Sequence, residues 1–160
     1  MNPTLLFLAA LLIGFATGLR TFTPMAFISW VSVWGWLPLG GSRLHFLGTE
    51  TGAMLVTALA VFELIIDKLP VTPPRTAKGP LGGRILIAIF AAASLALGMG
   101  SAWIVPAMGG AVAAVGGAFA GFYYRTSLTK ITKLPDIVFA LIEDVATVAL
   151  TLSAFKIVFG

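Results

Sequence analysis

Long apolar runs, broken only by a few charged residues, constrain this sequence more than any other feature. Of its 160 residues, 59% are hydrophobic and 10% are charged, and the mean hydropathy is +1.03. A soluble protein of this size leaves a large share of its residues facing water, so it cannot hide this much apolar surface. The composition therefore predicts an all-α integral membrane protein whose apolar side chains are covered by lipid.

Six apolar segments can be delimited, at residues 5–19, 25–39, 51–66, 85–99, 102–124 and 137–155. Several are shorter than the roughly 20 residues that a straight membrane span needs. Because only residues 20–24 join the first two segments, 25–39 is predicted to be either a thin span or a re-entrant segment. We expect a single transmembrane domain over residues 1–160, with about six short transmembrane or re-entrant helices.

The basic residues predict an orientation. They concentrate in the connection after the third segment and in the one after the fifth: Lys68, Arg75, Lys78 and Arg84, then Arg125, Lys130 and Lys133. Cytoplasmic connections are enriched in Lys and Arg, so both are predicted to be cytoplasmic, the first as a proline-rich loop at about 68–84. Six spans then place both termini outside, whereas a re-entrant second segment moves the N-terminus to the cytoplasm.

Composition also limits the partners and cofactors. The chain has no cysteine and a single histidine, which excludes disulfides, thiolate metal sites and multi-histidine sites, and we expect no cofactor. The net charge of +4 is better explained by contacts with anionic membrane lipids than by nucleic acid, which we do not expect as a partner. Glycine and alanine recur between residues 109 and 121, which favours close helix packing, either within the chain or in a homo-oligomer such as a dimer.

Acidic residues and one arginine inside the apolar segments are the candidate functional residues. An ionisable side chain at the centre of a membrane helix costs about 2.5–3.5 kcal/mol, so it usually faces the protein interior or a water-filled cavity. Glu63 and Asp67 share a helix face, and Glu143 would lie about 10 Å deep on the same side. The predicted substrate or ion pocket consists of Arg20, Thr21, Thr23, Glu63, Asp67, Glu143 and Asp144.

Arg20 lies where Pro24 interrupts helical hydrogen bonding, and the hydroxyls of Thr21 and Thr23 are predicted either to satisfy the freed backbone or to help Arg20 hold an anionic group. The alternative is that Arg20 pairs with Glu63 or Glu143 and fixes helix packing. An Arg-Thr dipeptide also begins at residues 75 and 125, and a guanidinium beside a hydroxyl suits a phosphate oxygen. Topology alone, however, already predicts basic residues at cytoplasmic helix ends, and this is the favoured explanation. The predicted headgroup or phosphate contacts are Arg75, Arg84 and Arg125.

Several motifs resemble those of a known family. They are Gly-Leu-Arg-Thr-Phe-Thr-Pro at 18–24, Glu-Leu-Ile-Ile-Asp-Lys-Leu-Pro at 63–70, Thr-Pro-Pro-Arg-Thr at 72–76, Ala-Phe-Ala-Gly at 118–121 with Arg125, and the Glu143-Asp144 pair. Together they resemble small bacterial membrane proteins catalogued as domain of unknown function 4126, over nearly the whole chain. The resemblance implies a multi-pass protein of the bacterial inner membrane and brings no activity or substrate.

Three functions are compatible with these residues. The first is a small transporter or channel-like protein with a polar pocket in the cytoplasmic half of the membrane. The second is a membrane-embedded enzyme or binding protein for a lipid or isoprenoid phosphate, with carboxylates around a divalent ion; the metal, if any, is not identified. The third is a scaffold whose buried charges are only paired. No nucleophile elbow, phosphate loop or zinc helix motif is present, so no catalytic residue is predicted and enzyme activity is disfavoured.

Overall fold

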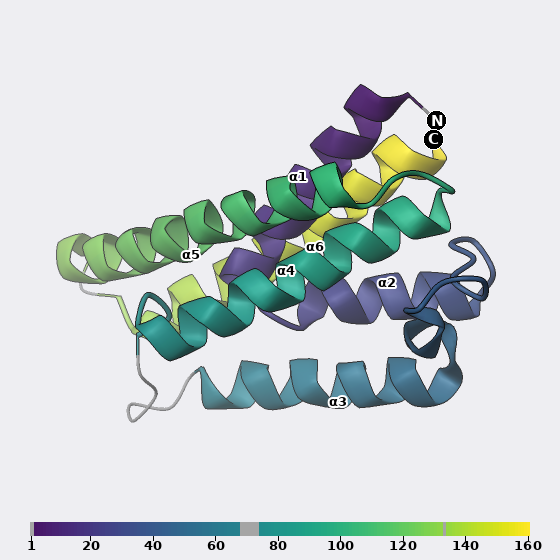
Figure 1. The fold of residues 1–160 in the computed structure, drawn as a ribbon. Helices are drawn as coiled ribbons and strands as arrows, with labels where there is room; N and C mark the ends of the chain where they lie inside the picture. The colour runs from purple at the N-terminus through teal and green to yellow at the C-terminus, as the bar shows by residue number, and fades with distance from the viewer. Residues whose placement is uncertain (1, 68–73, 133) are drawn as a thin grey trace.

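Six α-helices and one short 3-10 helix make up the computed structural model, which describes residues 2–67, 74–132 and 134–160. In chain order they are α1 (Pro3–Leu19), α2 (Thr23–Val33), η1 (His45–Gly48), α3 (Glu50–Ile66), α4 (Lys78–Gly98), α5 (Ile104–Thr132) and α6 (Asp136–Phe159) (Figure 1). These described residues contain no strand. The prediction of an all-helical chain with about six helices is confirmed.

Three helices, α4, α5 and α6, are long and apolar enough to cross a membrane, and α1 and α2 are shorter apolar helices. At 1.5 Å per residue the 11 residues of α2 extend about 17 Å, whereas the 29 residues of α5 extend about 44 Å. The hydrocarbon core is about 30 Å thick, so α2 alone is too short to cross it. These lengths are consistent with an integral membrane protein built from both long and short helices.

The second apolar segment ends earlier than the sequence suggested. We expected it to continue to residue 39, but α2 ends at Val33 and the chain then turns at Gly35, whose φ is +81°. A positive φ favours glycine because it has no Cβ, and a glycine in this conformation is the usual end of a helix. Apolar residues 34–39 therefore belong to a connection rather than to a helix.

Both basic connections are shorter than expected, because helix extends into them. The predicted loop at 68–84 gives way to α4 at Lys78; Pro80 lies in its first turn, where a missing N–H breaks no helical hydrogen bond. Likewise α5 continues through Arg125 and Lys130 and ends just before Pro135, as helices commonly do before proline. Residues 68–73 and Lys133, which were also predicted to be loop, lie outside the described residues.

The small residues of α5 pack against α1 within the chain. A Cβ on Gly14 would lie 2.5 Å from Gly110 Cα, and a Cβ on Gly117 would lie 3.0 Å from the carbonyl carbon of Phe15, closer than side chains approach. The two backbones therefore touch, as small residues allow between membrane helices. Of the two explanations left open by the sequence, packing within the chain is observed for this face, and a homo-oligomer stays a prediction.

Helices α1, α4, α5 and α6 pack together, and α2 and α3 lie along one side of them (Figure 1). The two termini lie together at one end, with the α2–α3 and α4–α5 connections. At the opposite end, α3 and α5 finish and α4 and α6 begin. Exposed Trp34, Trp36 and Trp103 belong to connections at the first end, and Trp36 packs edge-on against Phe159 there. The charged residues described next lie toward the opposite end, where α3 and α5 finish.

Candidate functional site

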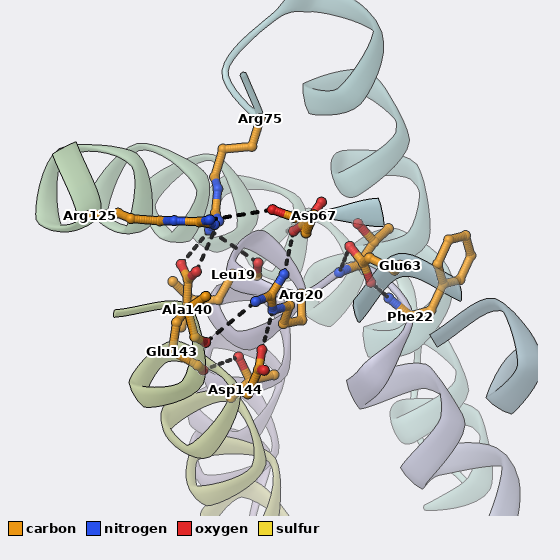
Figure 2. Close-up of polar contacts among 12 residues, drawn as sticks. Leu19, Arg20, Phe22, Glu63, Asp67, Arg75, Arg125, Ala140, Glu143 and Asp144 are labelled. Carbon is orange, nitrogen blue, oxygen red and sulfur yellow. Dashed lines mark hydrogen bonds and ion pairs between the residues drawn. The ribbon is translucent and has the colours of Figure 1, made fainter. Parts of the chain in front are cut away.

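A break between α1 and α2 begins the site. Arg20 is extended, with φ −135° and ψ 116°, and helix resumes only at Thr23. The N–H groups that precede α2 therefore lack helical acceptors, and those of Thr21 and Phe22 donate to the carboxylate of Glu63 on α3, at 2.7 and 2.9 Å (Figure 2). A carboxylate is favoured at this positive end of a helix. Two of the freed backbone N–H groups are therefore satisfied by Glu63 rather than by the hydroxyls of Thr21 and Thr23.

Arg20 joins three helices. Its side chain is fully buried, and its guanidinium pairs with Asp67 at the end of α3 and with Asp144 of α6, where Nε lies 2.5 Å from Oδ1 (Figure 2). Nη2 also donates to the carbonyl of Ala140 at 3.4 Å. The arginine is therefore paired, as the packing alternative anticipated, but with the two aspartates rather than with Glu63 or Glu143.

A second arginine reaches the interior from the segment that precedes α4. Arg75 forms a two-pronged ion pair with Glu143, whose Oε2 lies 2.9 Å from Nη2, and donates from Nη1 to the carbonyl of Leu19 at 3.2 Å. Both charged side chains are buried. Arg75 was predicted to contact headgroups from a loop, whereas its guanidinium lies inside the protein. Gly121 of α5 adjoins the pair, since a Cβ there would lie 2.7 Å from Nη1 of Arg75.

Arg84 and Arg125 complete the arrangement. Arg84 is buried on α4 and donates from Nε to the carbonyl of Gly18 at 3.1 Å, but its Nη2 lies 3.5 Å from Glu63 and 3.8 Å from Asp67. Arg125 on α5 donates from Nε to Asp136 at 2.6 Å and from Nη2 to the carbonyl of Asp67 at 3.3 Å. Arg84 therefore makes the longest ion pairs of the four arginines.

We call these side chains the ion cluster: Arg20, Arg75, Arg84, Arg125, Glu63, Asp67, Asp136, Glu143 and Asp144. It contains five of the six acidic residues of the chain. Asp136 was not among the residues predicted from the sequence, and its ion pair with Arg125 adds it to the cluster. Thr23, by contrast, was predicted to share the pocket, but it lines a separate apolar groove between α2, α3 and α6.

A pocket of about 670 Å³ adjoins the ion cluster, where α3 ends and α4 begins. Its charged walls are Glu63, Asp67, Asp136, Arg75, Arg84, Arg125 and Lys130. Within residues 2–67, 74–132 and 134–160, no three acidic or histidine side chains gather as they would around a metal ion. The carboxylates face arginines instead, so the arrangement is suited to ion pairing and to binding a charged group.

The fold and site together define a small all-helical protein with helices of membrane-crossing length and a partly buried ion cluster at one end. The chain belongs to the family described as Domain of unknown function (DUF4126), which matches residues 7–158. The family resemblance seen in the sequence motifs is therefore confirmed, and the matched region includes the whole cluster. Comparisons with curated proteins and with solved structures gave no match.

Proposed function

We propose that this protein is a small transporter of the bacterial inner membrane, and that the pocket beside the ion cluster binds its substrate in the cytoplasmic half of the bilayer. One observation carries the proposal: three arginines, one lysine and three carboxylates line a pocket of about 670 Å³ that adjoins the remaining charges of the ion cluster. Each buried charge is costly, so such groups usually serve a polar pathway or binding site. Pairing with an opposite charge lowers this cost, and a paired side chain can still exchange its partner for a substrate ion.

The helix break supports a moving part. Non-helical backbone at membrane depth is tolerated where it is buried in protein or lines a cavity, and transporters use broken helices of this kind to hold ions. Here Glu63 holds the start of α2, and Asp67 ties the end of α3 to Arg20. A cation that binds Glu63 or Asp67 would compete for these carboxylates and weaken both contacts. Helices α2 and α3 would then move relative to the other four.

Flux through liposomes tests this proposal. The purified protein is reconstituted, and the movement of protons, potassium, chloride and phosphate is followed with internal indicators. We expect flux of at least one of these ions above that of empty liposomes, and a loss of about tenfold or more in a Glu63→Gln variant. Glu50→Gln is the matched control, because Glu50 is the one acidic residue outside the ion cluster and is exposed at the start of α3.

Two results would reject the transporter. One is a rate equal to that of empty liposomes for all four ions. The other is a Glu63→Gln rate equal to that of Glu50→Gln, with both variants folded by circular dichroism.

A second candidate, a binding protein for a lipid or isoprenoid phosphate, is favoured by the basic walls of the pocket. Four basic side chains face three carboxylates there, and in the part of the chain that the structure describes Lys130 has no ion-pair partner. Guanidinium and ammonium groups are the usual partners of phosphate oxygens. Native mass spectrometry should then detect a phospholipid adduct that Arg84→Gln and Lys130→Gln both weaken. Retained adducts in both variants would exclude this pocket as the phosphate site.

A further inference from the structure

The apolar groove between α2, α3 and α6 has a volume of about 650 Å³ and shares no lining residue with the pocket beside the ion cluster. Its walls carry six aromatic side chains: Phe27, Trp30, Trp34, Trp36, Phe155 and Phe159. Ligand sites in proteins commonly occupy about 300–1,000 Å³. The groove is therefore large enough to hold a ligand in its own right.

The walls of the groove are mostly apolar. Its polar groups are few, and two of them bond each other, since Trp30 Nε1 donates to Thr57 Oγ1 at 3.0 Å. The Thr57 hydroxyl in turn donates to the carbonyl of Ala53 at 2.7 Å. Neither group needs a polar ligand, and a polar ligand in these walls would lose hydrogen bonds to water without replacement. The ligand that fits is an apolar chain.

The position of the groove indicates where such a chain comes from. Trp34 and Trp36, at one end of the groove, are 64% and 65% exposed, and tryptophan side chains of this kind are enriched at the membrane interface. From there the groove follows α2 and α3 into the apolar part of the molecule, where Val61 is half exposed. Protein interiors are close-packed, so the hydrocarbon of the surrounding bilayer is expected to fill a groove that opens to it.

We propose that this groove binds one acyl chain of a membrane phospholipid, as a site separate from the ion cluster. The bound chain would complete the packing of α3, which among the described residues packs against α2 and η1 (Figure 1). The proposal does not depend on transport, because none of the cluster residues lines the groove. A failed flux experiment therefore leaves it standing.

The tryptophans of the chain allow a direct test. Three of the four line the groove, and the fourth, Trp103, precedes α5. Two variants are made with phenylalanine at three of these positions, one keeping Trp30 and the other keeping Trp103. Each full-length variant, in detergent, is titrated with phosphatidylcholine brominated on its acyl chains, since bromine quenches a tryptophan that it touches. We expect saturable quenching of Trp30 at low lipid fraction, and quenching of Trp103 that rises in proportion to the lipid fraction.

A filling substitution sharpens the test. Val61→Phe places a ring in the groove at a half-exposed position that tolerates it, and we expect it to weaken the saturable quenching of Trp30 about tenfold. Val112→Phe makes the same change on the exposed face of α5, away from the groove, and should leave the titration unchanged. Non-saturable quenching of Trp30, or equal titrations in the two variants, would overturn the proposal. Shielding of Trp30 that grows with protein concentration would assign the groove to a second copy, and would overturn it too.

Discussion

Replacing Gly121 by alanine tests whether the buried Arg75–Glu143 pair holds the helices together. The added Cβ would overlap Glu143 Oε1 and lie 2.7 Å from Arg75 Nη1 and 2.9 Å from Leu19 Cδ2. The ends of long side chains can usually move aside from an added methyl group at little cost in free energy. Here each end is held by the other, and Arg75 is also held by the carbonyl of Leu19, so the methyl group can be accommodated only if the pair separates.

The magnitude follows from two opposing terms. Alanine is favoured over glycine inside a helix by about 1 kcal/mol. Separating a buried ion pair costs about 3–5 kcal/mol when a charge is left without its partner. The expected net effect of Gly121→Ala is a loss of about 2–4 kcal/mol in the free energy of unfolding. Gly116→Ala is the matched control on the same helix, because the nearest atom to its Cβ is 3.9 Å away in the ring of Phe15. That variant should gain up to about 1 kcal/mol.

The free energy of unfolding is measured by titrating detergent-solubilised protein with sodium dodecyl sulfate and following tryptophan fluorescence, because none of the four tryptophans is near Gly121 in the sequence. The two variants should differ by about 3–5 kcal/mol. If Gly121→Ala is as stable as Gly116→Ala, the pair contributes nothing measurable, and the argument that the ion cluster fixes this end of the bundle is wrong.

Three further predictions concern the same packing and pairing. Gly14→Ala should lower the melting temperature sharply in a thermal scan, since its Cβ would meet the backbone of Gly110 on α5; an unchanged melting temperature would contradict the observed helix contact. The double variant Arg75→Leu with Glu143→Leu should be more stable to denaturant than either single variant, because replacing a whole buried pair avoids an unpaired charge; a double variant less stable than both would refute this. Asp136→Asn should lower the free energy of unfolding by about 1 kcal/mol or less in the same titration, because the Asp136 side chain is 52% exposed and solvent screens its charge. A loss as large as that expected for the buried Arg75–Glu143 pair would contradict this screening.

The break between α1 and α2 was predictable from local sequence, and so were two of the four buried charged residues, Arg20 and Glu143. Pro24, preceded closely by Arg20, Thr21 and Thr23, marks the interruption, and a charged residue within an apolar run is recognisable because its burial in the membrane is costly. Helix lengths were less predictable. Hydropathy falls after Tyr124, which suggested a loop, yet nothing up to Thr132 breaks a helix, so α5 continues.

The pairing of arginines with acids was not predictable, because it depends on the register of helices that lie far apart in the sequence. Arg75 and Glu143 are 68 residues apart, and their meeting requires α5 and α6 to be in place. Thr23 illustrates a smaller error of the same kind. Thr21 lies in the non-helical break, where its N–H donates to Glu63 of the ion cluster, whereas Thr23 begins α2 and lines the apolar groove.

The position of Asp136 was predictable from the short connection between α5 and α6. Few residues separate the end of α5 from the start of α6, so side chains just before and just after this turn lie close together. Arg125 and Asp136 are 11 residues apart and meet across it. Treating the turn as a hairpin of two helices, rather than as a basic loop, would have paired them.

The arrangement of Arg20 ties assembly to the order of synthesis. Its two acidic partners follow it by 47 and 124 residues, and the second lies in the last helix of the chain. The arginine therefore leaves the ribosome long before Asp144 exists. A nascent or truncated chain that stops before α6 carries Arg20 with only one of its two acidic partners. The pairing of Arg20 is therefore complete only once α6 has been made.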